Sequence, residues 1–347
     1  MIVDKVSELI GNTPMLRVPV PHRETQLLLK MEKMNPGGST KDRMAHSMVL
    51  AAIKAGRLEP GGVIVESSSG NTGIGLAIAA VEFGLRFIAV VDHHAAPDKI
   101  AVMRALGAEI RYVEGDYRED EVAVVERQRL AAQIAGEIPG AIFMNQSDNT
   151  ANAGGYSAFV REAIEQGEGR IDAYVGCVGT GGSMTGIGRG LKAHNAETVI
   201  AAVEPDGSIV FGGPGHAYYQ SGTGTPQGDT VGLVLDYGCI DLGLRVTDSQ
   251  AFETARYFAR CHGLLVGGST GGTLYKALEL VAERRIGGNV LVSVADGGEK
   301  YLQTIFNDAW MEAKGLRDPG VWERLDEWLG RPAAGTTPAE LPRLAVA

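Results

Sequence analysis

The sequence predicts an α/β protein of two domains with twisted, mostly parallel sheets flanked by helices. Two observations support this fold class. Continuous apolar runs, which are typical of strands covered on both faces, alternate along the chain with helix-like segments. The alternation occurs twice, around residues 43–145 and again around residues 170–300. Alternation of strands and helices is typical of largely parallel sheets.

The expected elements follow one another in a regular order. The strand-like segments are 61–70, 85–92, 108–116, 171–182, 198–207 and 288–298. Each of them runs into a turn. The helix-like segments are 72–84, 97–108, 183–195 and 269–285. The second of these helices opens with Pro97-Asp98 and closes at Gly107, which are typical start and stop signals.

This rhythm divides the chain into two α/β domains with a ligand cleft between them. We expect a smaller, mobile domain over residues 43–148 and a larger, cofactor-binding domain formed by residues 1–42 and 149–313. Residues 314–347 form a C-terminal extension of different character. Within it, 321–329 predicts a short amphipathic helix, and the Pro-, Ala- and Thr-rich end predicts a partly mobile tail.

Composition narrows the possible classes of function. The formal charge is −10, and an acidic chain repels phosphate backbones, so we expect no nucleic-acid partner. No apolar run reaches the roughly 18 residues of a transmembrane helix. The first residues lack a signal-peptide pattern, so we expect a cytoplasmic protein without a membrane partner. Cys177, Cys239 and Cys261 form no CxxC pair, so neither disulfides nor a metal site is expected.

Glycine accounts for 48 of the 347 residues and gathers in short loops between apolar runs. Two of these loops, Ser67–Gly73 and Gly179–Ser183, stand where a strand should give way to a helix. Backbone N–H groups and the helix dipole at such a position favour an anion. The alternative is that these glycines only allow a tight turn between strand and helix, without any bound ligand. Neither loop is a Walker or dinucleotide motif, so ATP and NAD are poor candidates.

Lys41 follows a Pro-Gly-Gly turn that could direct its side chain into a cleft at the start of a helix. Desolvation and the positive end of the helix dipole would both favour the neutral, nucleophilic amine. Most lysines are solvated surface charges, so the spacing alone leaves both interpretations open. A third glycine-rich loop, Gly267–Gly272, again begins a helix.

Six segments together resemble the cysteine synthase / cystathionine β-synthase family of fold-type II pyridoxal phosphate (PLP) enzymes. In chain order they read IGNTPMLR (Ile10–Arg17), EKMNPGGSTKDR, ESSSGNTGIGLA, NQSDNTAN, GTGGSMTG and GGSTGGT. The likeness covers about residues 5–310, and six matches in one order are more specific than any single motif. The resemblance implies a tryptophan synthase β-like fold, PLP as cofactor, small amino-acid substrates and a homodimer.

The resemblance also implies roles for individual residues. Lys41 would form the internal aldimine with PLP and later move the α-proton. Asn71 would hydrogen-bond the phenolic oxygen of PLP, and Ser269 would meet the pyridine nitrogen. A hydroxyl there makes PLP a weaker electron sink and favours elimination over transamination. The PLP phosphate would be held by Gly179, Thr180, Gly181, Gly182 and Ser183. The substrate carboxylate would be held by Ser68, Ser69, Gly70, Asn71, Thr72 and Gln146.

By the same resemblance, the chain replaces the β-substituent of an activated L-serine, either O-phosphoserine or O-acetylserine, through an α-aminoacrylate. Departures from the usual cysteine synthase pattern favour a side branch. Val91–Lys99 replaces the usual Met-Pro run, and its VVDxxxxP pattern together with Gly207–Gly212 is similar to the branch that makes 2,3-diaminopropionate precursors. That branch uses an amine nucleophile, such as glutamate, instead of sulfide.

Other functions stay open at this point. A cysteine synthase would use sulfide on the same donors. A dehydratase of this fold would release a ketoacid, but its lysine segment typically reads Ser-Phe-Lys, where this chain has Ser39-Thr40-Lys41. A catalytically idle regulatory partner of a serine-activating enzyme would keep the fold alone. The joint presence of Lys41, Asn71 and Ser269 disfavours that idle partner.

Overall fold

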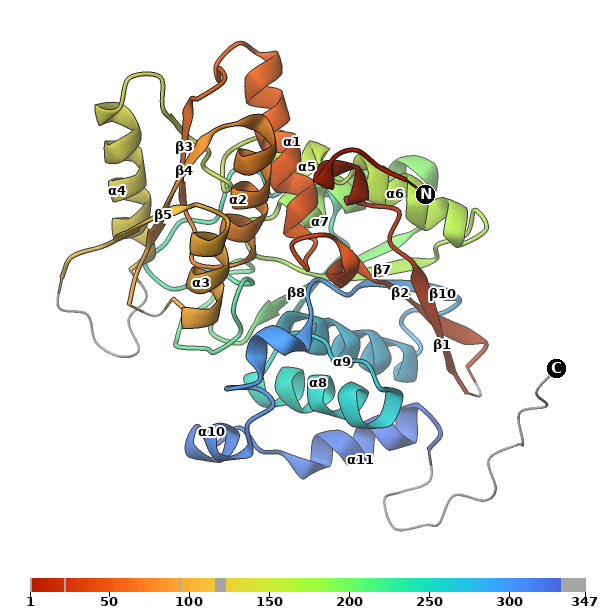
Figure 1. Ribbon diagram of the computed structural model, residues 1–347. Helices are drawn as coiled ribbons and strands as arrows, with labels where there is room; N and C mark the ends of the chain where they lie inside the picture. The colour runs from red at the N-terminus through yellow and green to blue at the C-terminus, as the bar shows by residue number, and fades with distance from the viewer. Residues whose placement is uncertain (1, 22, 94, 116–122, 332–347) are drawn as a thin grey trace.

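The strands form two separate sheets, drawn in Figure 1. The computed structural model describes residues 2–21, 23–93, 95–115 and 123–331. One sheet has four strands in the order β5-β4-β3-β6, and the other has six in the order β1-β2-β10-β7-β8-β9. Every pairing is parallel except that of β1 with β2. The predicted α/β class with mostly parallel sheets flanked by helices is therefore confirmed.

Helices cover both faces of the four-stranded sheet (Figure 1). α4 packs Ala131 against Val65 and Val90, while α2 and α3 lie on the opposite face. All five residues of β3 are buried, as expected for a strand covered on both sides. The bounds are β3 (Val63–Ser67), β4 (Arg86–Val91), β5 (Glu109–Tyr112), β6 (Ile142–Phe143), α2 (Asn71–Phe83), α3 (Pro97–Ala105) and α4 (Val124–Glu137).

The six-stranded sheet is covered in the same way. α8, α9 and α11 lie below it in Figure 1, and α5, α6 and α7 lie above it, with α1 packed against α2 and α5. Its strands are β1 (Met15–Val20), β2 (Thr25–Lys30), β7 (Ala173–Cys177), β8 (Val199–Pro205), β9 (Leu242–Val246) and β10 (Asn289–Ser293). The helices are α1 (Lys41–Lys54), α5 (Ala151–Gly154), α6 (Ser157–Gln166), α7 (Gly182–His194), α8 (Asp248–His262), α9 (Gly268–Ala282), α10 (Asp308–Ala313) and α11 (Pro319–Trp328). Short 3₁₀ turns are η1 (Val6–Leu9), η2 (Glu32–Met34), η3 (Tyr237–Cys239) and η4 (Gly298–Tyr301).

One hydrophobic core joins the two sheets. It contains Ile64 and Ala89 of the four-stranded sheet, Met48 of α1, and Ile200 and Leu291 of the six-stranded sheet. A second core, between the six-stranded sheet and α8, α9 and α11, includes Val292. Because the first core is shared, the domain boundaries expected after residues 42 and 148 stay a prediction.

Each segment that the sequence marked as a strand or helix forms one, including α11 near the end of the described chain. Strands β1, β2, β6 and β9 were not expected. Burial alternates along β1 and β9, so these two lack the continuous apolar run that identifies a strand covered on both faces. The tail expected to be mobile lies outside the described residues from 332 onward.

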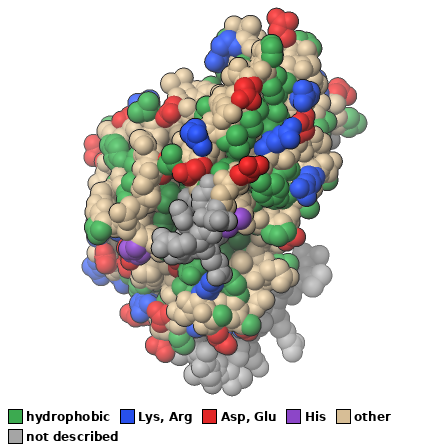
Figure 2. Space-filling view, turned by 90° about the vertical axis from the view of Figure 1, so that its left-hand side faces the viewer, with side chains coloured by type: hydrophobic (Ala, Val, Ile, Leu, Met, Phe, Trp, Pro, Cys, Tyr) green, Lys and Arg blue, Asp and Glu red, His purple; other side chains and the backbone are tan. Residues whose placement is uncertain are grey.

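The surface carries charges of both signs. Figure 2 shows Lys and Arg side chains beside Asp and Glu side chains on the face formed by the four-stranded sheet and its helices. Every helix within the described residues is too short or too polar to span a bilayer. Cys177, Cys239 and Cys261 are all free thiols.

A buried ion network fixes the start of α1. The Arg43 guanidinium lies 2.6 Å from Glu32 and 2.8 Å from Glu162, and the fully buried Lys30 lies 2.7 Å from Glu162. Burial alone would raise the pKa of Glu162, but hydrogen bonds from Arg43 and Lys30 lower it to about 2. Removing one partner of such a network leaves a costly unpaired charge. The network therefore ties α1 to β2, η2 and α6.

Close packing of α8 on α9 requires a glycine. A Cβ on Gly271 would lie 2.0 Å from the carbonyl oxygen of Ala251, whereas a Cβ on Gly136 of α4 would meet nothing within 4 Å. We predict that Gly271→Ala lowers the free energy of unfolding by about 1–3 kcal/mol through overpacking. The matched Gly136→Ala should raise it by about 0.5–1 kcal/mol through helix propensity. Urea denaturation measures both, and equal effects of the two variants would contradict this packing.

Candidate active site

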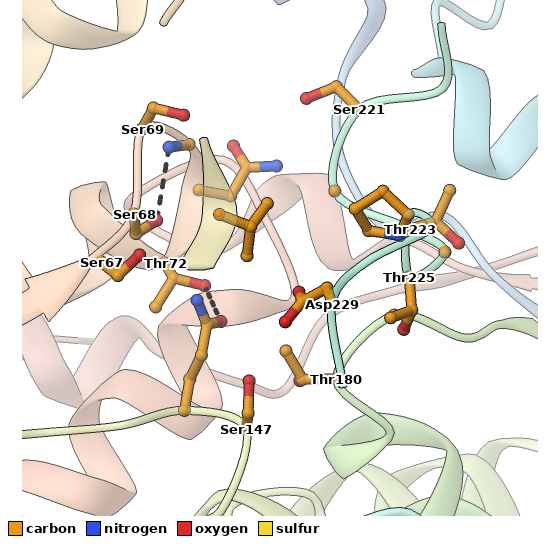
Figure 3. Close-up of a pocket in the computed structure, with 18 of the residues that line it drawn as sticks. Ser67, Ser68, Ser69, Thr72, Ser147, Thr180, Ser221, Thr223, Thr225 and Asp229 are labelled. Carbon is orange, nitrogen blue, oxygen red and sulfur yellow. Dashed lines mark hydrogen bonds between the residues drawn. The ribbon is translucent and has the colours of Figure 1, made fainter. Parts of the chain in front are cut away.

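A cavity of about 750 Å³ opens where the parallel strands of both sheets end. Loops after β3, β6, β7 and β10 line it, as expected for ligand sites at the carboxyl ends of open α/β sheets. Figure 3 shows Ser68, Ser69 and Thr72 along one side of the cavity, Thr223 and Thr225 along the other, and the Asp229 side chain between them. The predicted site residues that line it are Lys41, Ser68, Ser69, Gly70, Asn71, Thr72, Gln146, Gly179, Thr180, Gly181, Ser183 and Ser269.

Lys41 is the first residue of α1, and the turn before it is held from the end of β10. The N–H of Thr40 donates to the carbonyl oxygen of Ala295 at 2.8 Å. The Lys300 ammonium donates to the carbonyl oxygen of Gly37 at 3.0 Å. These bonds place the Lys41 side chain at the cavity wall rather than in solvent.

The surroundings of Lys41 favour a neutral amine. Burial lowers the pKa of Lys41, and only the nearby Cys177 and Asp296 act in the opposite direction. Among the described residues, the Lys41 amine has no hydrogen-bond or salt-bridge partner. A desolvated primary amine without a fixed partner is suited to attack a carbonyl group or to accept a proton.

The loop after β3 forms one wall with its hydroxyls and amides. Ser68 Oγ accepts hydrogen bonds from the N–H groups of Gly70 at 3.3 Å and Gly73 at 3.1 Å, which shapes the start of α2. Thr72 Oγ1 donates to Gln146 Oε1 at 2.8 Å, which joins this loop to the segment after β6 (Figure 3). The structure thus brings together the residues expected to hold the substrate carboxylate, and their role in binding stays a prediction.

The loop after β7 leads into α7 with unpaired backbone donors. The first intrahelical bond runs from the N–H of Thr185 to the oxygen of Gly181, so earlier N–H groups have no carbonyl partner within the helix. Gly181 has φ of +92°, a conformation that favours glycine. Gly182 does not line the cavity, because it packs against Asn152, where a Cβ would lie 2.0 Å from Oδ1.

This site fits PLP. The helix start of α7 and the hydroxyls of Thr180 and Ser183 would hold the phosphate. The cavity joins that loop to the amine of Lys41, and Ser269, only 9% exposed at the start of α9, lines the same space. PLP supplies an aldehyde that binds amines and a ring that withdraws electrons from them.

Sequence reasoning missed several charged residues of the cavity. Glu66, Arg127, Asp229 and Asp296 line it, and Lys300 contacts its wall through Asn71. Asp296 lies at the carboxyl end of the predicted strand-like segment 288–298, a common place for functional residues in parallel sheets, so that position was a usable signal. Arg127 and Asp229 lie in segments without a recognisable motif, and only the folded chain brings them to the cavity.

Comparisons with known proteins agree with this site. The model of the family described as pyridoxal-phosphate dependent enzyme matches residues 6–297. A Sinorhizobium fredii protein named "Putative cysteine synthase" is 68% identical, covering 95% of this chain and 98% of its own. The O-acetylserine dependent cystathionine beta-synthase of Bacillus subtilis is 35% identical, with 87% and 96% covered. The crystal structure of O-ureido-L-serine synthase matches with a TM-score of 0.80 at 32% identity, covering 90% of this chain and 100% of that one.

The chain therefore belongs to the family of pyridoxal phosphate-dependent enzymes. Within it, the chain is a cysteine synthase-like enzyme that depends on PLP. The fold and cofactor expected from the sequence are thereby confirmed.

The buried carboxyl group of Glu66 in the cavity wall makes the stability of the fold depend on pH. It is 1% exposed and accepts hydrogen bonds from the N–H groups of Ser67 and Gln146. Burial raises the pKa of Glu66 to about 8, although these two bonds and the charge of Arg127 lower it. The folded protein therefore holds a proton on Glu66 that the unfolded chain releases near its ordinary pKa of 4.5.

We predict that this proton stabilises the fold most below pH 4.5 and that its contribution is lost as the pH rises towards 8. Glu66→Gln cannot titrate, so the free energy of unfolding of the wild type should fall steadily relative to that of this variant from pH 5 to pH 8. Chemical denaturation at several pH values measures it. A difference that does not change with pH would show that Glu66 is ionised throughout.

Proposed function

We propose that the chain joins an activated L-serine, O-phosphoserine or O-acetylserine, to an amine nucleophile that carries its own carboxylate. The product would be a precursor of 2,3-diaminopropionate. Overall, the bond from Cβ to oxygen breaks, a bond from Cβ to nitrogen forms, and phosphate or acetate leaves. The incoming ammonium loses one proton. The observation that carries this proposal is the pair of Arg127 and Asp229, which line the same cavity as Lys41.

Arg127 supports the binding of an anionic group beside the carboxylate loop. Its Nη1 donates to Ser69 Oγ at 3.2 Å, so the guanidinium lies next to that loop. Its Nε is buried and makes no hydrogen bond within the described residues, although it lies 3.4 Å from Asp92 Oδ2. A buried donor of this kind costs free energy until it finds an acceptor. The carboxylate of an amino-acid nucleophile or the phosphate of O-phosphoserine would provide one.

Asp229 supports an amine over sulfide. Burial raises the pKa of Asp229, the N–H of Thr230 and the charge of Arg127 lower it, and Asp148 raises it further. A carboxylate at the cavity wall attracts an ammonium group and can accept the proton that the amine must lose before it attacks. The same carboxylate repels a sulfide anion.

Each residue near the cofactor would have a role that matches its position in the cavity. Ser68–Thr72 with Gln146 would bind the donor carboxylate, and Lys41 would move the proton at its α-carbon. Gly179–Ser183 would hold the cofactor phosphate, with Asn71 and Ser269 on the ring. Water has to be kept away from the reacting carbons, and a cavity lined by loops of both sheets favours that.

A second candidate is a cysteine synthase that uses sulfide. The relative from Sinorhizobium fredii, 68% identical, carries that description. Both candidates share the donor and the cofactor, and they differ only in the nucleophile. The homodimer and the cytoplasmic location also belong to the proposal, and sedimentation velocity of the purified chain tests the former.

The first prediction concerns the attachment of the cofactor. Borohydride reduction of the wild-type protein with PLP should fix the cofactor on the peptide that contains Lys41, because this amine is desolvated and faces the cavity. Lys41→Ala should show no modified peptide at any site and no β-replacement. Peptide mass spectrometry provides the measurement. An equally modified peptide elsewhere in Lys41→Ala would refute the assignment.

The second prediction concerns the choice of nucleophile. With O-phosphoserine or O-acetylserine as donor, Asp229→Asn should lower kcat/KM for glutamate by about 10- to 100-fold, and it should leave kcat/KM for sulfide unchanged or raise it. Mass spectrometry of the products measures both. Asp206→Asn is the matched control, since this exposed carboxylate pairs with His216 and does not line the cavity. An equal loss with both nucleophiles would contradict the role of Asp229.

A further inference from the structure

The side-chain amide of Asn71 is held from both sides. Its Nδ2 donates to Asp296 Oδ2 at 2.8 Å, and its Oδ1 accepts from Lys300 Nζ at 2.8 Å. A flipped amide would turn its NH₂ group towards an ammonium and its oxygen towards a carboxylate. Both contacts would be repulsive, so the amide has one stable orientation. The side-chain nitrogen keeps a second N–H that no described residue accepts, and Asn71 lines the cavity.

Lys300 uses all three of its donors. Besides Asn71, it donates to the carbonyl oxygens of Gly37 at 3.0 Å and Gly38 at 3.1 Å. A single ammonium thus connects the turn before Lys41 to the first residue of α2. Burial lowers the pKa of Lys300, while Asp296, Asp42 and Glu299 raise it.

Asp296 is fixed as firmly as Lys300. It is 2% exposed, and its Oδ2 also accepts from the hydroxyl of Tyr301 at 2.7 Å. An isolated β-bridge pairs its backbone with Ser39. The Asn71 amide therefore lies between an immobilised anion and an immobilised cation. Charge-assisted hydrogen bonds of this kind are stronger than neutral ones.

We propose that Lys300 is a positioning residue that acts through Asn71. By occupying the amide oxygen, Lys300 presents the remaining N–H of Asn71 to the cavity, where the phenolic oxygen of PLP would accept it. This inference rests on the proposed role of Asn71 in the site. A donor to that oxygen favours its ionised form, so loss of Lys300 should change both cofactor affinity and the pH dependence of the cofactor spectrum.

The test uses purified protein, PLP alone and no substrate. Lys300→Met keeps the unbranched shape and most of the length of the side chain and removes its donors. We expect its dissociation constant for PLP to rise about tenfold, as for the loss of one charge-assisted hydrogen bond. We also expect the midpoint of the visible-absorbance titration with pH to shift. Lys300→Arg, which keeps the charge and the donors, should recover most of both properties.

A double-mutant cycle distinguishes an effect of Lys300 through Asn71 from an effect through the turn at Gly37 and Gly38. In an Asn71→Ala background, Lys300→Met should change PLP affinity and the titration midpoint much less than in the wild type. A full effect in that background would mean that Lys300 acts through Gly37 and Gly38, which would overturn the inference.

Lys33→Met is the matched control. Lys33 contacts Glu299, the residue before Lys300, but is not bonded to Asn71. Its PLP affinity and titration midpoint should equal those of the wild type. A wild-type titration for Lys300→Met would overturn the inference and leave the proposed function intact. Failure of the wild type to bind PLP through Lys41 would instead refute the proposed function itself.

Discussion

The position of Lys41 depends on the turn before it, and the rest of the site depends on Lys41. That turn is bonded to the end of β10 through Ala295 and to η4 through Lys300. Because these anchors directly follow β10 of the six-stranded sheet, the amine is fixed relative to that sheet although α1 packs on α2 of the other one. The same anchors enclose the amine in the cavity wall, and the resulting desolvation lowers its pKa.

The cavity contains charged side chains, and several of them are held in fixed positions by hydrogen bonds. Asp296 accepts hydrogen bonds from Asn71 and Tyr301, and Lys300 gives all its donors to defined acceptors. The hydrogen bonds of Asp296 Oδ2 and Lys300 make the wall near Lys41 rigid. Arg127 keeps a buried donor without a hydrogen bond within the described residues, which marks the part of the cavity where a ligand has most to contribute.

The remote parts of the fold maintain this arrangement. Both sheets direct the carboxyl ends of parallel strands to the cavity, and one hydrophobic core runs from one sheet to the other. The ion pairs of Arg43 with Glu32 and Glu162, and of Lys30 with Glu162, hold the beginning of α1 in place. A shift of either sheet would therefore disturb both the packing of the core and the buried ion pairs. This cost keeps the loops of the site in fixed positions relative to one another.

The sequence by itself determined most of the central strands, the helices that follow them and the glycine-rich loops, and its resemblance to a known family singled out Lys41. These features can be recognised locally, because a continuous apolar run or a cluster of turn residues involves only residues that are close together in the sequence. Tertiary structure alone decided which charges meet in the cavity. Asn71 and Asp296 are 225 residues apart, and Ser69 and Arg127 are 58 apart, so no local pattern connects them. The edge strands β1 and β9 escaped prediction because their burial alternates, so neither carries the continuous apolar run of a strand that is covered on both faces.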